Sequence, residues 1–169
     1  MSKQYKQIHC VINGKEREAM VDVRASLTDL LRNDFRLTSV KKGCEVGECG
    51  ACNVLVNGEC FNSCIYLAVW ADGKEILTLE GLEGPNGEIS DIQQAFIDEA
   101  AVQCGFCTPG AIMSAVEILN EGRELSDEEI RKGSPHIDHD FPLFSVDGTF
   151  DQFIPVTHRS RLLPEERTP

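Results

Sequence analysis

Hydrophobic and polar residues alternate near the start of the chain with the two-residue period of a β-strand. The segment "QIHCVING" (7–14) alternates in this way and ends on Asn13-Gly14, a pair that two-residue hairpin turns favour. The segment "REAMVDV" (17–23) follows at the distance of a returning strand. The pattern therefore predicts a β-hairpin at the start of the fold.

The pattern then changes to one helix and further strands. "SLTDLLRNDF" (26–35) begins with a serine N-cap and predicts a helix. Its leucines fall on one helical face: Leu27, Leu30 and Leu31. "NVLVNGECF" (53–61) predicts a second strand pair around another Asn-Gly turn, and "EILTLEG" (75–81) a further short strand. Strands around one helix are typical of an α+β fold.

Beyond the linker "GPNGE" (84–88), the apolar residues recur with the period of α-helices. One helix is predicted to follow a Ser90 N-cap and to bury one stripe: Ile92, Ala95, Phe96 and Ala100. A second is predicted after Thr108, with Pro109 in its first position and Gly122 as its stop. Its apolar stripe comprises Ile112, Ala115, Val116 and Leu119.

The last part of the chain follows neither the strand period nor the helix period for long. Ser126 and Glu129 have the spacing of a capping box, which predicts a short third helix. From Ser134 onward, five of the seven prolines interrupt the sequence, and we expect an irregular segment. The chain is thus predicted to divide into three regions: 1–84, 85–133 and 134–169.

The 169 residues include 28 acidic and 16 basic side chains, a formal net charge of −12. So acidic a surface argues against nucleic acid and anionic membranes as partners, but is compatible with a protein partner. No apolar run has the length of a membrane span, and the opening residues lack the apolar core of a signal peptide. We therefore expect a cytoplasmic protein. Eight cysteines in that reducing compartment indicate metal or redox chemistry rather than disulfides.

Four cysteines have the spacing C-x4-C-x2-C-x11-C, and the first three match plant-type ferredoxins: Cys44, Cys49, Cys52 and Cys64. An iron–sulfur cluster on thiolates concentrates negative charge, so backbone N–H groups must point towards it. A glycine-rich loop allows this, and the loop contains Gly43, Gly47 and Gly50. Zinc is the alternative, although it prefers two closely spaced pairs. The spacing therefore predicts an iron–sulfur site.

A second cysteine pair, Cys104 and Cys107, lies in "QCGFCTPG" at the start of the second predicted helix. A C-x-x-C pair at a helix N-terminus is also typical of thioredoxin-like redox sites, but the surrounding pattern is not βαβ. A zinc site shared with Cys49 and Cys52 is a further alternative, one that leaves the other two loop cysteines unused. Half of a second cluster site is the interpretation we favour.

The remaining cysteines and the histidines predict no ligand role. Cys10 and Cys60 fall within predicted strands and are interpreted as small core residues. His136 and His139 in "HIDHD" could be metal ligands, but a solvated polar loop explains the same residues.

Two segments in combination, "KKGCEVGECGACNVLVNGECFNSC" (41–64) and "AVQCGFCTPG" (101–110), resemble the iron–sulfur subunit of the molybdenum hydroxylases. This is the family of xanthine dehydrogenase, aldehyde oxidoreductase and aerobic carbon monoxide dehydrogenase. The stretch "CIYLAVWADGKEILTLEGL" (64–82) is most similar to xanthine-dehydrogenase-type small subunits. The resemblance covers roughly residues 5 to 133.

The resemblance implies a ferredoxin-like β-grasp domain (1–84) followed by a small four-helix-bundle-like domain (85–133). In the family, the first domain holds one 2Fe–2S cluster, here on Cys44, Cys49, Cys52 and Cys64. The second domain holds another, here with Cys104 and Cys107 as ligands, and Gln103 corresponds to a position close to molybdopterin. That cofactor belongs to a separate large subunit, and electrons leave it through both clusters to an FAD-binding subunit or another acceptor.

The chain departs from the family after Cys107. The family completes its second cluster with a C-x-C pair, in a phrase resembling "GNLCRCTGY", and this chain has no further cysteine. Histidine replaces cysteine on one iron of Rieske centres, and polar residues stand about where that pair would arrive: His136, Asp138, His139 and Asp140. Their segment lacks a glycine-rich cradle of N–H groups. We therefore predict one stable cluster and an incomplete helical domain, with Cys104 and Cys107 free, oxidised together or holding adventitious metal.

The leading hypothesis is a 2Fe–2S electron-transfer subunit of a xanthine-dehydrogenase-like molybdenum hydroxylase, with no catalytic centre of its own. The alternatives are a free single-cluster ferredoxin-type carrier and a zinc-binding structural protein. Apolar residues in the last region predict an interface with other chains: Phe141, Phe144, Phe150 and Phe153. The substrate is not predicted, because the family binds it on another chain.

Overall fold

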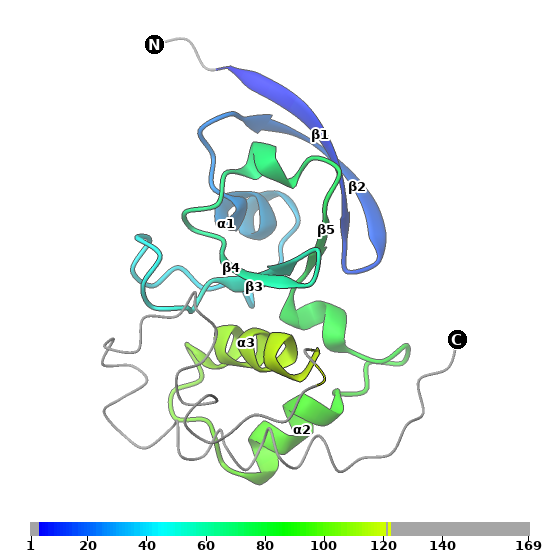
Figure 1. Cartoon of the computed structure of the whole chain (residues 1–169), viewed down its shortest axis with the longest axis vertical. Helices are drawn as coiled ribbons and strands as arrows, with labels where there is room; N and C mark the ends of the chain where they lie inside the picture. The colour runs from blue at the N-terminus through cyan, green and yellow to red at the C-terminus, as the bar shows by residue number, and fades with distance from the viewer. Residues whose placement is uncertain (1–3, 121, 123–169) are drawn as a thin grey trace.

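The computed structural model describes residues 4–120 and 122 of the chain. A five-stranded mixed sheet has the order β2-β1-β5-β3-β4, in which β1 and β5 are parallel and the other neighbours antiparallel. The strands are β1 (Tyr5–Ile12), β2 (Lys15–Asp22), β3 (Asn53–Val56), β4 (Glu59–Asn62) and β5 (Glu75–Leu77). Figure 1 shows the sheet above two helices, α2 and α3.

Both predicted hairpins are present. β1 pairs with β2 through the Asn13-Gly14 turn, whose residues have φ of 51° and 72°. β3 pairs with β4 through Asn57-Gly58, with φ of 52° and 89°. Positive φ at both central residues is the type I′ pattern that Asn-Gly favours, which is why these local signals were sufficient.

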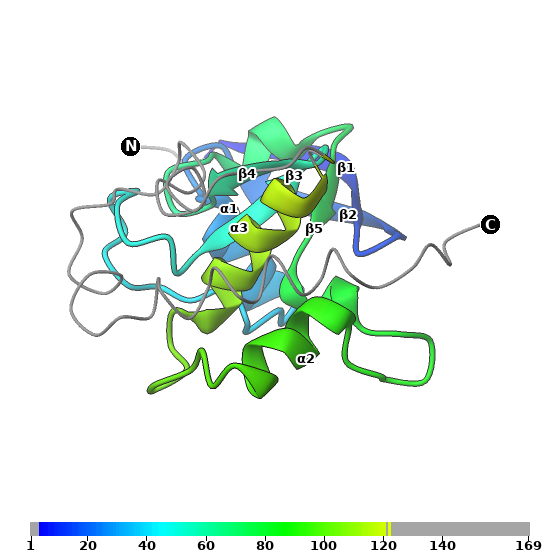
Figure 2. The ribbon, with the colours of Figure 1, turned by 60° about the horizontal axis from the view of Figure 1, so that its bottom comes forward.

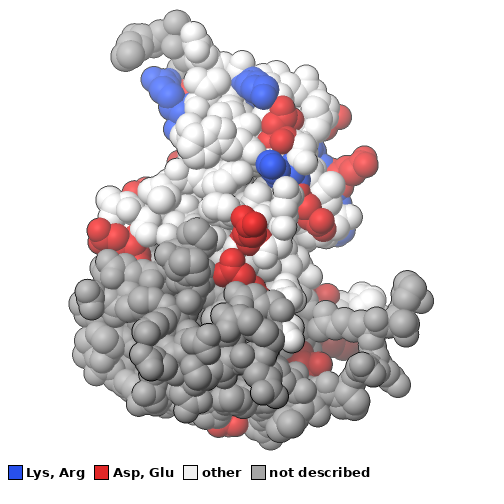
Figure 3. Space-filling view, in the orientation of Figure 1, with Lys and Arg blue, Asp and Glu red and all other residues white. Residues whose placement is uncertain are grey.

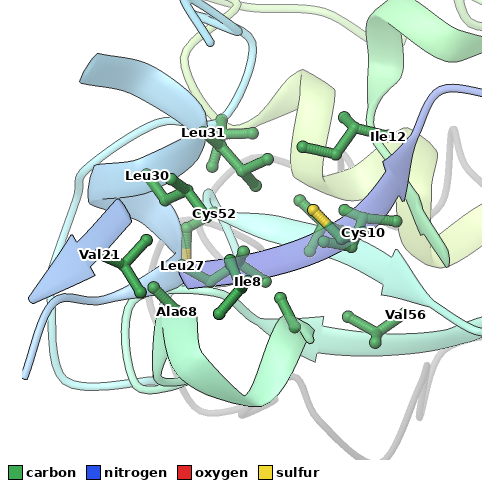
Figure 4. Packing of buried hydrophobic residues seen from close by; sticks show 14 residues of the cluster. Ile8, Cys10, Ile12, Val21, Leu27, Leu30, Leu31, Cys52, Val56 and Ala68 are labelled. Atoms are coloured by element: carbon green, nitrogen blue, oxygen red, sulfur yellow. The ribbon is translucent and has the colours of Figure 1, made fainter. Parts of the chain in front are cut away.

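The helix predicted over 26–35 is present, but its second half is wider than an ordinary α-helix. α1 (Leu27–Asp29) begins at Ser26, whose hydroxyl accepts the N–H of Asp29. It continues as a π-helix, η1 (Leu30–Asp34), and the N–H of Phe35 donates to the Leu30 carbonyl. The predicted leucines are all buried, and they pack against alternate residues of β1 (Figure 4): Ile8, Cys10 and Ile12.

Strand β3 lies between two layers. All four of its residues are buried, as expected for a strand covered on both faces. Val54 and Val56 belong to the core beneath α1 and η1, whereas Leu55 packs with Met113 of α3 on the opposite face. Short 3-10 helices complete the path of the chain: Ala68–Ala71 and Leu79–Leu82.

Helix α2 (Asp91–Asp98) starts as predicted and ends sooner. Ser90 and Gln93 form a reciprocal capping box at its N-terminus. The prediction that Ala100 belongs to the buried stripe is wrong. This residue follows the helix, has a left-handed φ of 52° and is exposed, while Ala101 turns inward and is buried instead.

Helix α3 (Thr108–Asn120) lies between the sheet and α2 (Figures 1 and 2). Its predicted stripe contacts α2, where Ile112 and Ala115 are buried beside Phe96. A second buried face, not predicted, contacts β3 and β4 through Met113 and Ser114, and Gly110 on the same face packs against the segment just before β3. Pro109 is the second helical residue rather than the first, and Gly122, after the last turn, has the left-handed φ of 66° expected of a helix stop.

The predicted third helix at 126–132 and the region 134–169 lie outside the described residues. Within residues 4–120 and 122, no helix has the length and apolar character that crossing a bilayer requires. On the face shown in Figure 3, basic side chains lie only in the upper part, among acidic ones, and the described part lower down shows acidic side chains alone. The fold is α+β, a ferredoxin-like sheet domain followed by helices.

Candidate metal centre

The cysteine loop (43–52) connects η1 to β3 and contains three of the four predicted ligands. Three residues of this loop have left-handed φ: Glu45 at 57°, Gly47 at 83° and Gly50 at 66°. These reversals keep the backbone curled around a small volume and turn successive N–H groups inward. Gly47 and Gly50 therefore provide the left-handed backbone conformations for which glycines were predicted in this loop.

The inward N–H groups converge on the sulfur of Cys44. The amides of Val46, Glu48 and Cys49 donate to Cys44 Sγ at 3.5, 3.3 and 3.3 Å. The amide of Cys44 donates in turn to Cys49 Sγ at 3.4 Å. Four N–H groups thus stabilise negative charge on this pair of sulfurs, which is what a thiolate-ligated cluster requires.

The hairpin β3–β4 brings the fourth cysteine back to the loop. Cys52 precedes β3 and Cys64 follows β4, and their thiols are hydrogen-bonded to each other. Ser63 joins the two segments, because its hydroxyl and its N–H both donate to the Cys52 carbonyl, at 2.6 and 3.4 Å. The four predicted ligands therefore form two adjacent pairs, Cys44 with Cys49 and Cys52 with Cys64.

The surroundings shift the acidity of these thiols in opposite directions. Partial burial alone would raise the pKa of Cys44, but the N–H groups of Val46, Cys49 and Glu48 outweigh it and lower this pKa to about 7. Burial, together with the charge of Cys52, raises the pKa of Cys64 to about 12. Because thiols bind metal as thiolates, filling the site must displace a proton from Cys64.

Neighbouring side chains hold the loop in place. The Asn62 side-chain amide donates to the Gly47 carbonyl at 2.7 Å. Lys42 Nζ lies 2.6 Å from Asp29 Oδ1, which connects the start of the loop to α1. Gly43 is constrained by proximity: a methyl group there would lie 2.7 Å from Cys49 Sγ and 3.6 Å from Phe106 Cε1.

The second predicted pair lies on a different segment, 101–107, which leads into α3. Cys104 is exposed, and Cys107 is half-buried at the N-cap, where its carbonyl accepts the N–H of Ala111 at 3.1 Å. Gln103 is exposed on the same segment. Phe106, between these two cysteines, lies beside Gly43 of the cysteine loop.

The other two cysteines are core residues, as predicted. Cys10 in β1 and Cys60 in β4 are 5% and 0% exposed. Burial raises the pKa of Cys60 to about 12. His9 lies on β1, with Nδ1 3.2 Å from Glu18 Oε1.

Sequence reasoning missed the polar contacts that attach the helical part to this centre. Asn53, next to Cys52, donates to Ser114 Oγ at 2.9 Å, and Cys60 N–H donates to Glu117 Oε1 at 2.7 Å. Gly110, one helical turn before Ser114, packs its Cα against the Gly50 carbonyl. The only available signal was the spacing of a glycine, a serine and a glutamate on one otherwise apolar helix.

The paired arrangement fits a 2Fe–2S cluster, in which each of two irons takes two protein ligands. No group of three or more His, Cys, Asp or Glu side chains among the described residues is arranged around one metal ion. The observation that supports the fit is the set of N–H groups aimed at the sulfurs of the Cys44–Cys49 pair.

Comparison with known proteins agrees with this chemistry. A model of a 2Fe-2S iron-sulfur cluster binding domain matches residues 10–77, and a [2Fe-2S] binding domain matches residues 78–135. The xanthine dehydrogenase iron-sulfur-binding subunit of Escherichia coli O157:H7 is 52% identical over 128 residues, which cover 75% of this chain and 79% of that protein. The chain belongs to the iron–sulfur subunits of the molybdenum hydroxylases.

Other members are similar over most of the chain. The nicotinate dehydrogenase small FeS subunit of Eubacterium barkeri is 47% identical over 123 residues, 73% of this iron–sulfur subunit and 78% of that protein. Quinoline 2-oxidoreductase from Pseudomonas putida 86 superposes with a TM-score of 0.79 at 36% identity, covering 94% of this chain and 97% of that one. The predicted family, fold class and electron-transfer role are confirmed.

Proposed function

We propose that this iron–sulfur subunit holds one 2Fe–2S cluster, with one iron on Cys44 and Cys49 and the other on Cys52 and Cys64. It passes electrons from a molybdopterin-binding large subunit to an FAD-binding subunit or another acceptor. The observation that supports the assignment most directly is the convergence of backbone N–H groups on Cys44 Sγ. A bound cluster supplies a one-electron couple, and the chain sets its environment.

The residues of the site differ in how they affect the bound cluster. Cys49 and Cys52 are each 2% exposed, so they keep water from one side of the site. Cys44 and Cys64 are partly exposed, and Val46, whose N–H donates to Cys44 Sγ, is 62% exposed. Electrons therefore have a short route to the surface on the Cys44 side. The N–H groups directed at Cys44 stabilise the more negative, reduced state and thereby raise the potential.

The partner assignment rests on the family and on exposed residues of the second segment. Gln103 is exposed just before Cys104, where a neighbouring subunit can contact it. We assign this side to the molybdopterin-binding subunit. The same proposal includes a cytoplasmic location and a division into domains 1–84 and 85–133, with 134–169 as a separate tail.

The ligand assignment is tested by replacing one cysteine of the loop. Cys49→Ser in the full chain should lose most of its visible absorption and its reduced-state EPR signal, because serine is a poor ligand for this cluster. The matched control is Cys10→Ala, which removes a thiol from the core and should keep both signals. Zinc in place of iron would leave the wild-type chain colourless. An unchanged spectrum in Cys49→Ser would refute the ligand set.

A further inference from the structure

The number of cysteines limits what the second segment can hold. Eight cysteines are present: four belong to the cysteine loop and the hairpin after it, and Cys10 and Cys60 are buried within strands. Only Cys104 and Cys107 remain for the [2Fe-2S] binding domain matched over 78–135. A 2Fe–2S cluster takes four protein ligands, so this domain lacks half of a cysteine set.

The geometry of the segment suits a different chemistry. Gly105, between the two cysteines, has a left-handed φ of 79°, which reverses the backbone within the C-x-x-C motif. Cys104 is exposed in the chain by itself, so a small oxidant can reach it there before the molybdopterin-binding subunit covers this side. Two thiols at this spacing close readily to a disulfide in redox proteins.

We propose that Cys104 and Cys107 form a reversible dithiol–disulfide site in place of a second cluster. This proposal rests on the proposed function in one respect: it assumes that the other four ligating cysteines bind the first cluster. With glutathione disulfide as oxidant, the Cys104 thiolate attacks one sulfur, breaks the glutathione S–S bond and releases one glutathione. Cys107 then attacks the mixed disulfide and releases the second. The protein loses two electrons and two protons, and two glutathione thiols receive them.

The site is coupled to the cysteine loop through Phe106. This residue stands between the two cysteines, and its ring edge lies beside Gly43, which also neighbours Cys49 Sγ and Ala51. Closing a ring across Cys104 and Cys107 restricts the backbone that carries Phe106. The contact at Gly43 then changes, and with it the packing around one ligand of the first cluster.

The test uses the full chain purified with its cluster, incubated in reduced or oxidised glutathione. We expect iron for one cluster per chain in both states. Alkylation and mass spectrometry should find Cys104 and Cys107 modified in the reduced sample and protected, joined to each other, in the oxidised one. The visible circular dichroism of the cluster should change reversibly between the two.

Two variants separate the parts of the proposal. Cys104→Ser should form no internal disulfide and show no spectral change. Phe106→Ala, at a position already 42% exposed, should still form the disulfide but lose the spectral change.

Iron for two clusters, or thiols that stay reactive in oxidised glutathione, would overturn the proposed dithiol–disulfide site. A disulfide without any spectral change in the wild-type chain would overturn the coupling. Absence of iron in the wild-type chain would instead refute the proposed function, while the thiol measurement remained valid.

Discussion

At the scale of single residues, Glu80 shows how a half-buried carboxylate supports the approach to the metal centre. It lies on the 3-10 helix after β5 and accepts hydrogen bonds from the N–H and hydroxyl of Ser39 and from the Thr78 hydroxyl. Ser39 lies just upstream of the cysteine loop. Burial alone would raise the pKa of Glu80, but the hydrogen bonds from Ser39 and Thr78 outweigh it and hold this pKa below its usual 4.5.

A folded-state pKa below the unfolded value means that ionised Glu80 stabilises the fold above pH 4.5. This contribution declines as the pH falls through the lowered folded value. We expect Glu80→Gln to reduce the free energy of unfolding by about 1–2 kcal/mol at neutral pH, because it weakens charge-assisted hydrogen bonds. Urea unfolding should show this difference from wild type shrinking below pH 4.5. Glu59→Gln, at an exposed position on β4, is the control; an equal effect there would contradict the explanation.

At the scale of elements, the contact between α3 and the cysteine loop depends on a glycine inside a helix. In most exposed helices, Gly→Ala is stabilising by about 1 kcal/mol. At Gly110, a methyl group would collide with the Gly50 carbonyl, which is backbone and cannot rotate away. Either α3 or the loop must then move.

We therefore expect Gly110→Ala to lower the free energy of unfolding by about 1–3 kcal/mol, the usual cost of overpacking. Because Gly50 lies between two of the proposed ligands, the visible circular dichroism of the cluster should change as well. Asn120→Ala, at the exposed end of the same helix, should leave both properties close to wild type. A stabilised Gly110→Ala variant would show that α3 does not rest on the loop as described.

At the scale of the whole molecule, the net charge of −12 is spread over 169 residues, and a bound cluster adds further negative charge. Self-repulsion destabilises a compact chain, and salt screens it. Raising NaCl from about 0.01 to 0.15 M shortens the screening length from about 30 to 8 Å. We expect this increase in NaCl to raise the melting temperature of the full chain by a few degrees. The same concentration of KCl should raise it by the same amount. A melting temperature that falls over this range would contradict charge repulsion as a significant term.

Local chemistry in the sequence was sufficient for much of the fold and of the centre. An Asn-Gly pair reaches its turn conformation through its own backbone preferences, and Ser90 caps the helix that directly follows it. The glycines between Cys44, Cys49 and Cys52 let one continuous loop direct its own N–H groups at the sulfurs of Cys44 and Cys49. These features were predictable because the interacting groups are close in sequence.

Only the tertiary structure decided the features that join distant segments. The widening of η1, the outward position of Ala100 and the second buried face of α3 were not evident from the apolar pattern. The same is true of the Asn53–Ser114 hydrogen bond and of Phe106 beside Gly43, whose partners lie about sixty residues apart. Periodicity reports that a face is apolar, but not which element covers it. The partner is determined by how complete surfaces fit together, and no local pattern encodes that fit.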